Sequence, residues 1–298
     1  MSVPFEDRLA APPAVVVVPR RPHAALRAFL RNPSALAGLL LLVAVAGLAL
    51  AAPWLFPGDP LDMVASPLLW PFQDAAFPLG SDSLGRNVAA GIAHGARVSL
   101  AVGVVTALLN LGIGIVVGAT AGYFGGAVDD LLVRVTELFQ TIPTFLLVIV
   151  VVAIGQPSVT VIVAAIGLAS WPVIARLVRA EFRTLRETEF VLAARAQGSG
   201  HLRIVLQEML PNALPPVIVT SSVLVASAIL IESALSFLGM GDPNAVSWGS
   251  MIGDGRELLR TAWYLTALPG GAIVVTVLAL NLVGDGLNDA LNPRLRGR

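Results

Sequence analysis

Repeated apolar runs constrain this sequence more than any other feature. The first covers residues 36–52 and continues through Trp54, Leu55 and Phe56. At about 1.5 Å per helical residue, its roughly 20 residues match a hydrocarbon core about 30 Å thick. Five further runs follow, at 98–122, 138–154, 159–175, 214–238 and 262–284. Together the runs predict an all-α integral membrane protein with six transmembrane helices.

The composition supports this interpretation. Charged residues make up only 13% of the chain and apolar residues 56%, too little charge to cover the surface of a water-soluble fold. The sequence Ala49-Leu50-Ala51 resembles a signal-peptidase cleavage site, but the first run starts late and further spans follow it. We therefore expect this run to remain as an uncleaved first span. The third and fourth runs are the shortest of the six.

Arginine is distributed unequally between the two sides of a six-span protein. Fifteen arginines fall on the side that holds both termini and the 176–213 connection, and four fall on the other side. Because cytoplasmic connections are enriched in basic residues, we expect both termini and 176–213 to be cytoplasmic. The 57–96 and 239–261 connections are then external. Five prolines in 57–96 argue against a long helix there.

These assignments divide the chain into four segments. They are a cytoplasmic N-terminal segment at 1–34, a first span with its external loop at 35–96, a core transmembrane domain at 97–290, and a cytoplasmic tail at 291–298. The expected location is a plasma or inner membrane, crossed several times.

Two residue types are absent, and their absence excludes several kinds of chemistry. Without cysteine the chain cannot form disulfides or a Cys-ligated metal site. Without lysine it supplies neither the Walker A lysine of an ATPase nor a Schiff base. Its three histidines are scattered along the sequence. Asp285 and Asp289 share a helical face but have no third ligand, so we interpret them as polar groups at a helix end. We therefore expect no enzyme, no metal site and no directly bound cofactor.

Two periodic patterns lie on the predicted helices. A four-residue glycine repeat predicts a smooth ridge that another helix approaches closely, either as ordinary membrane packing or in a pore-forming contact. Its members are Gly114, Gly118, Gly122 and Gly126. A set of arginines at helical spacing predicts that the fourth span continues as a basic stripe, which either anchors at anionic headgroups or carries force to a partner. Its members are Arg176, Arg179, Arg183 and Arg186.

Glu232 is a single acid inside the fifth run, near its predicted outer end. An acid within a span is costly unless it is hydrogen-bonded or faces water. Two roles stay open: a structural hydrogen bond to a neighbouring helix, or a position lining or gating a pathway. One acid provides no proton-relay chain, and this disfavours a proton-coupled carrier.

The 176–213 connection contains Leu192-Ala193-Ala194-Arg195-Ala196-Gln197-Gly198, followed later by Leu210-Pro211. This resembles the EAA loop of ABC importer permeases, in which Glu-Ala-Ala precedes a Gly and then a Leu-Pro pair. The alanine pair, Gly198 and Leu210-Pro211 keep the spacing, whereas Leu192 replaces the Glu and Glu208 replaces an Ile. The resemblance implies a coupling helix at about 189–198 that docks on an ATPase. The implied coupling-loop residues are Glu189, Ala193, Ala194, Arg195, Gly198, Leu210 and Pro211.

Other segments are similar to the C-type permease subunit of dipeptide/oligopeptide or nickel ABC importers. The most specific is 78–86, Pro-Leu-Gly-Ser-Asp-Ser-Leu-Gly-Arg, with Asn87 where the family has an Asp. The remaining matches are Gly95-Ala96-Arg97-Val98-Ser99-Leu100, Gly122-Tyr123-Phe124-Gly125-Gly126, Leu235-Ser236-Phe237-Leu238-Gly239, Trp248-Gly249-Ser250-Met251 and Gly284-Asp285-Gly286-Leu287. The similarity covers roughly residues 27–296.

The resemblance implies a type I ABC importer permease fold. A homologous B-type permease subunit would form the other half of the pathway, two cytoplasmic ATP-binding subunits would drive it, and an external binding protein would deliver the substrate. ATP would be used by the partner subunits. Peptides are the expected substrate, with nickel or another small solute as the alternative. A secondary carrier is disfavoured because the sequence shows neither an inverted repeat nor several intramembrane ionisable residues.

Overall fold

The computed structural model describes residues 22–291, and within that range every regular element is helical. In chain order the elements are α1 (Pro22–Arg31), α2 (Pro33–Leu55), α3 (Val88–Phe124), α4 (Gly126–Thr141), α5 (Thr144–Gly155), α6 (Val159–Arg186), α7 (Glu189–Ala196), α8 (His201–Arg203), the π-helical η1 (Ile204–Met209), α9 (Leu210–Phe237), α10 (Trp248–Gly255), the 3-10 turn η2 (Arg256–Leu258) and α11 (Tyr264–Leu291).

Among these elements, five helices are long and apolar enough to cross a membrane: α2, α3, α6, the continuous helix His201–Phe237, and α11. The α4–α5 pair becomes a sixth span if it is counted as one broken segment. The all-helical fold with up to six spans is therefore confirmed.

The third predicted span differs from our expectation of a single helix over 138–154. The chain forms α4 and α5 instead, which are bent by 81° at a short break. Pro143 provides the cause, because the residue before a proline is driven out of the helical region. Ile142 accordingly has φ −93° and ψ 129°, an extended conformation. At about 1.5 Å per residue, α5 alone is about 18 Å long and cannot cross the core.

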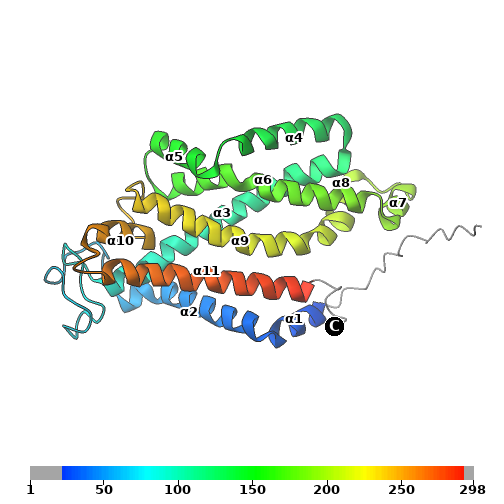
Figure 1. Ribbon diagram of the computed structural model, residues 1–298. Coiled ribbons are helices and arrows are strands. Elements are labelled where there is room, and N and C mark those ends of the chain that lie inside the picture. Colours follow the sequence, from blue (N-terminus) through cyan, green and yellow to red (C-terminus); the bar gives the residue numbers. More distant parts are fainter. Residues whose placement is uncertain (1–21, 292–298) are drawn as a thin grey trace, which may run out of the picture.

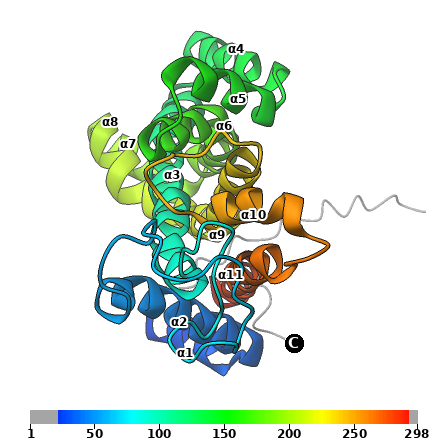
Figure 2. The ribbon, with the colours of Figure 1, turned by 90° about the vertical axis from the view of Figure 1, so that its left-hand side faces the viewer.

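Figure 1 shows the long helices roughly side by side. One end of the bundle, here called the α7 end, carries α7, the start of α1 and the end of α11. The other end, here called the α10 end, carries α10 and the 57–87 connection. α3 and α6 pack along each other at the centre, α9 lies against both, and α11 lies between α9 and α2. Viewed from the α10 end, α4 and α5 form one edge of the bundle and α1 with α2 the opposite edge (Figure 2).

The glycine ridge explains the close contact between α3 and α6. A Cβ atom at Gly114 would lie 2.6 Å from the Ile174 Cβ, and one at Gly122 would lie 2.6 Å from the Phe182 Cβ. Gly118 faces the same helix. Gly126 does not belong to the ridge, because it begins α4 with φ +53° and nothing lies within 4 Å of its Cβ position. The predicted four-glycine ridge is therefore a three-glycine ridge that packs α3 on α6.

Two expected helix boundaries are also corrected, and one connection contains a helix. α3 begins at Val88, so the end of the 57–96 connection is helical; the Asn87 side chain caps it by accepting from the Ala89 and Ala90 amides. The fifth span begins at His201 instead of 214, because a π-helical segment accommodates Pro211, which lacks an N–H. The 239–261 connection contains α10, which has a Ser247–Ser250 capping box.

The predicted continuation of the fourth span is confirmed, since α6 runs without interruption to Arg186. The sequence did not predict α1, which packs beside α11. Most of the N-terminal segment and the C-terminal tail, with six of the arginines behind the orientation, lie outside the described residues. The orientation therefore stays a prediction.

Candidate functional site

The helix expected at about 189–198 is present as α7, a separate helix between α6 and α8. One face of it is buried: Val191 is fully buried and packs in a core cluster with Phe182, Ile204 and Met209. The other face is exposed and consists of Glu189, Leu192, Ala193, Arg195 and Ala196. Leu192, which stands where the EAA pattern has an acid, is 47% exposed. The exposed face therefore combines two alanines with one aliphatic side chain, and it has a charged residue near each end.

The two members of the alanine pair point in different directions. Ala193 lies on the exposed face, whereas Ala194 is partly buried against the core cluster beneath α7. Leu210 packs against the same cluster. Pro211 lies in the first turn of α9, on its exposed side. The sequence pattern brings these residues into one region, but only Ala193 of the pair is available to a partner.

A Schellman motif ends α7. The Gly198 amide donates to the Arg195 carbonyl at 2.9 Å, and the Ser199 amide donates to the Ala194 carbonyl at 3.0 Å. Gly198 has φ +77°, a left-handed conformation that costs a residue with a Cβ roughly 1–2 kcal/mol. The turn therefore directs the chain from α7 back into the long fifth span.

Tyr123 at the end of α3 joins α7 and α8 to the bundle. It is buried, and its hydroxyl lies 2.8 Å from Nδ1 of His201 at the start of α8. The Arg195 guanidinium of α7 lies 5.2 Å from the centre of the Tyr123 ring. Sequence reasoning missed this cluster. The only sequence signal for this cluster was the Gly-Tyr-Phe-Gly-Gly segment, which did not reveal the residues that Tyr123 contacts.

The basic stripe of α6 is partly paired. Arg179 forms a bidentate contact with Asp129 of α4, through Nε to Oδ1 and through Nη2 to Oδ2 at 2.7 Å. Both side chains are largely buried, at 28% and 13% exposed. Arg186 contacts the exposed neighbouring Glu187 at 3.0 Å. The stripe therefore holds α4 against α6 at one point, and Arg176 and Arg183 are exposed.

Glu232 is buried inside α9 near the α10 end, with 2% exposure. Its carboxylate accepts a hydrogen bond from Ser236 Oγ at 2.7 Å, one turn later on the same helix. Close by, a Cβ at Gly249 of α10 would lie 2.5 Å from the Ser233 Cα, so α10 covers this part of α9 closely. Ser233 Oγ on the same helix is a second donor at 3.5 Å, and Ser247, the N-cap residue of α10, also approaches this carboxyl. The choice between structural and pathway roles stays a prediction.

Asp289 lies near the end of α11 and accepts from Nδ2 of Asn32, the N-cap residue of α2, at 3.2 Å. This contact fits the interpretation of Asp289 as a polar group at a helix end. Among residues 22–291, no group of three or more His, Cys, Asp or Glu side chains has an arrangement that could hold a metal ion.

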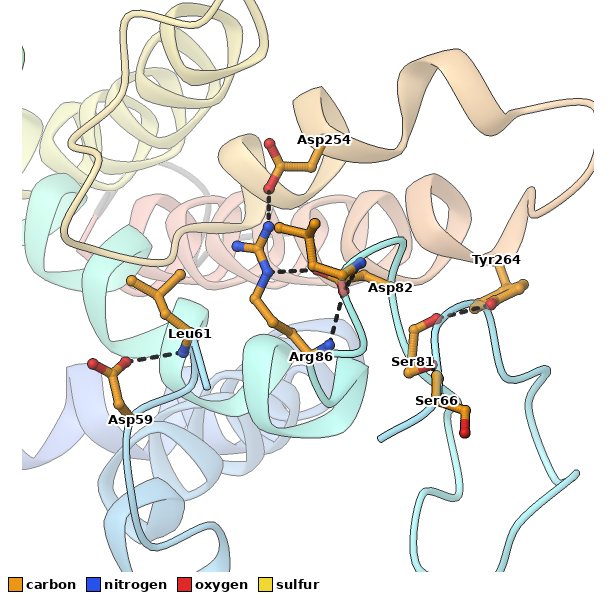
Figure 3. Close-up of polar contacts among 9 residues, drawn as sticks. Asp59, Leu61, Ser66, Ser81, Asp82, Arg86, Asp254 and Tyr264 are labelled. Atoms are coloured by element: carbon orange, nitrogen blue, oxygen red, sulfur yellow. Dashed lines mark hydrogen bonds and ion pairs between the residues drawn. The ribbon is translucent and has the colours of Figure 1, made fainter. Parts of the chain in front are cut away.

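The 78–86 segment shapes the 57–87 connection at the α10 end (Figure 3). Asp82 Oδ1 accepts from the amides of Leu84 and Arg86, at 2.9 and 2.8 Å, which closes the turn. Gly80 has φ +78°, and its Cβ position is occupied by the Leu69 carbonyl. Tyr264 of α11 donates to the Leu69 carbonyl at 2.8 Å and contacts the Ser81 carbonyl at 2.9 Å. The connection is therefore folded tightly onto the bundle without regular secondary structure.

A cavity of about 270 Å³ lies beside this segment, between the 57–87 connection, α10 and the start of α3. Arg86 lines it, with Nε 2.8 Å from Asp82 and Nη2 3.4 Å from Asp254 of α10. Figure 3 shows the three side chains converging. Partial burial raises the pKa of the Asp254 carboxyl, and the positive charge of Arg86 opposes that rise. These contacts join the 57–87 connection to α10.

Two sequence-family models match the chain. That of the binding-protein-dependent transport system inner membrane component matches residues 114–297. That of the N-terminal transmembrane domain of oligopeptide transport permease C matches residues 23–79.

Curated relatives match over nearly the whole chain. The di/tripeptide transport system permease protein DppC of Pseudomonas aeruginosa is 38% identical, with 91% of each chain covered. The dipeptide transport system permease protein DppC of Haemophilus influenzae is 36% identical, with 90% of this chain and 93% of the relative covered. That of Bacillus subtilis is 37% identical, with 91% and 85% covered.

A solved structure has a similar fold. It is an inward-facing form of the MetNI methionine ABC transporter, which matches with a TM-score of 0.56 and 18% identity. The match covers 68% of this chain and 96% of the other chain.

Proposed function

The chain belongs to the family of binding-protein-dependent transport system inner membrane components, the permease subunits of ABC importers, and from this premise we propose that it forms half of a pathway for peptides. It is a multi-pass membrane protein and not an enzyme. The peptide assignment rests on the names of its relatives, which are dipeptide or di/tripeptide permeases. The other half of the pathway would come from a homologous B-type permease subunit.

We further propose that α7 docks into a groove on a cytoplasmic ATPase subunit. The observation that carries this proposal is the exposed face of α7 around Leu192 and Ala193, which stands on a buried opposite face. The two exposed alanines let a partner approach closely, and the exposed leucine gives it an apolar contact. Glu189 and Arg195 lie at the two ends of the helix on this exposed face and would set polar contacts at its rim.

Two ATP-binding subunits, one for each permease, would use ATP, and this chain would bind no cofactor itself. An external binding protein would deliver peptide to the α10 end. This arrangement places the α7 end and both termini in the cytoplasm, which agrees with the arginine distribution. The division of the chain at 34, 96 and 290 belongs to the same proposal.

The contacts of α7 suggest how ATPase movement would reach the spans. α7 is joined to α6 by a two-residue link, to α9 through the Gly198 turn and η1, and to α3 through Tyr123. When the ATPases close, α7 would move as a rigid body with the ends of these three helices. The bundle would then rock between two packed states, as is common for switching transitions.

The test is Ala193→Trp in the complete importer. A bulky ring on the exposed face should leave membrane insertion intact but reduce co-purification of the ATPase subunits, and peptide-stimulated ATP hydrolysis should fall in parallel. Extra volume in a tight contact costs roughly 1–3 kcal/mol. The control is Leu40→Trp, which places the same ring at a 61%-exposed position on the apolar surface of α2. Wild-type co-purification and hydrolysis in Ala193→Trp would remove support for α7 as the docking helix.

A further inference from the structure

Leu192 lies in the middle of the exposed face of α7, at the position where the EAA pattern has a glutamate. Glu189, three residues before it, and Ala196, four residues after it, share its side of the helix. Val191, the preceding residue, is fully buried, so the core beneath α7 holds Leu192 on the outer face. The middle of this face therefore carries no charge.

The two charges of the face lie near its ends. The Arg195 guanidinium, in the last turn, lies 5.2 Å from the centre of the Tyr123 ring of this chain's own bundle. Glu189 is in the first turn, where the helix dipole stabilises an acid. Three residues separate it from Leu192, which is about 4.5 Å along the helix axis. A partner group placed to meet position 192 would therefore face an aliphatic side chain.

The next helix adds apolar side chains to the same end of the bundle. α7 packs against η1, and Leu202 of α8 and Leu206 of η1 are 71% and 50% exposed. Their continuous helix, His201–Phe237, has 37 residues, so it is about 55 Å long and extends beyond a core about 30 Å thick. Its apolar run begins at 214, which places both leucines outside the hydrocarbon. An apolar partner surface is what would bury them.

The side chain at position 192 determines which partner surface fits. A carboxylate buried without a partner is costly, so a groove that accepts the Glu form of the loop must offer a hydrogen-bond donor or a positive charge there. Facing Leu192, that donor would be buried without an acceptor, and affinity would fall by roughly 5- to 150-fold. An apolar socket has the opposite preference, because it gains from burying leucine and excludes a carboxylate.

We propose that the ATPase subunit that pairs with this chain has an apolar socket facing Leu192, in place of the donor that the Glu form requires. Leu192 is then a specificity-determining residue, because an ATPase groove with a base at this point would be a poor partner. The inference rests on the proposed docking of α7 and adds the chemistry of the surface on which α7 docks.

A series of substitutions at this one position tests the sign of the preference. Leu192→Met keeps the apolar character and nearly the volume, Leu192→Gln adds polarity without charge, and Leu192→Glu restores the acid of the EAA pattern. The permease pair in nanodiscs is titrated with its own ATPase subunits in the absence of ATP. Peptide-stimulated hydrolysis is then measured in the complete importer. Because Leu192 lies on the exposed face of α7, the yield of the permease pair should be the same for every variant.

The socket predicts a definite order of affinities. Leu192→Met should bind the ATPase subunits within about threefold of the wild type. Leu192→Glu should bind them at least about tenfold more weakly, because its carboxylate would be buried without a donor. Leu192→Gln should lie between the two, and peptide-stimulated hydrolysis should follow the same order.

Two results would overturn the proposal. Tighter binding of the ATPase subunits to Leu192→Glu than to the wild type would mean that the groove presents a donor at this position. Equal binding by all three variants would mean that the groove does not enclose residue 192. Ala193→Trp in the same titration separates these results from a failure of docking itself: if α7 docks, Ala193→Trp weakens binding even where the Leu192 series does not.

Discussion

Tyr123 allows the mechanical link between α7 and the bundle to be measured. Its hydroxyl bonds to His201 at 2.8 Å, and its ring faces Arg195 at 5.2 Å. Tyr123→Phe removes a hydrogen bond worth about 1 kcal/mol net, which should lower the protection of α7 amides about fivefold. Tyr123→Leu also removes the cation–π contact, so the two losses together cost about 1.5–2 kcal/mol. The protection of α7 amides should then fall about 10- to 30-fold.

Hydrogen–deuterium exchange of α7 in the assembled importer is the appropriate assay, because it reports the free energy of local opening. Thr120→Ala is the matched control, since its hydroxyl bonds only within α3, to the Val116 carbonyl at 2.7 Å. The control should leave α7 exchange unchanged. Peptide-stimulated ATP hydrolysis should decrease in the same order as amide protection: it should be lower in Tyr123→Phe than in the wild type, and lowest in Tyr123→Leu. Wild-type exchange of α7 in Tyr123→Leu would refute the link.

Three further predictions concern the bundle and its orientation. Gly118→Val should lower thermal stability and complex yield by overpacking the α3–α6 contact, at a cost of roughly 1–3 kcal/mol. Gly112→Val is the control and should lower neither, because nothing lies within 4 Å of the Gly112 Cβ position. If Glu232 is a structural acceptor, Glu232→Gln should keep most transport and Glu232→Leu should lose assembly; a fully assembled and active Leu variant would dismiss both proposed roles. An impermeant thiol reagent added outside intact cells should label Asn244→Cys and spare Ser199→Cys. Labelling of Ser199→Cys would mean that the orientation is opposite to the one predicted.

The spans and α7 were predictable because each depends on local sequence. Apolar runs identify membrane helices whatever they pack against, and the resemblance of the Ala-Ala…Gly pattern to the EAA loop implied α7 and its turn. The glycine ridge was predictable for the same reason, since a four-residue repeat fixes one face of a helix. Gly126 was wrongly included, because the repeat in sequence continues beyond the point at which α3 ends.

The broken third span was missed for an identifiable reason. Residues 138–154 were read as one run by their apolar character, although Pro143 signals that the preceding residue leaves the helix. The start of α3 was missed because 88–96, which is apolar or glycine except for His94, was assigned to the proline-rich connection before it, even though Asn87 is a good capping residue. In both cases a local backbone signal was overlooked.

The contacts that define the candidate sites could not be read from the sequence. Tyr123 and His201 are 78 residues apart, and Asp129 and Arg179 are 50 apart. Neither pair follows a helical period, so only the packing of α3, α4 and α6 brings the partners together. The inward orientation of Ala194 likewise depends on the core beneath α7.

Uptake of a labelled dipeptide into proteoliposomes tests the central claim most directly. The vesicles would contain this chain with its B-type permease and ATPase partners, and the binding protein would be added outside. The account predicts accumulation that requires internal ATP and the binding protein, and that falls in Ala193→Trp but not in Leu40→Trp. Accumulation that is independent of ATP, or no accumulation by an assembled complex that hydrolyses ATP in response to the loaded binding protein, would contradict it.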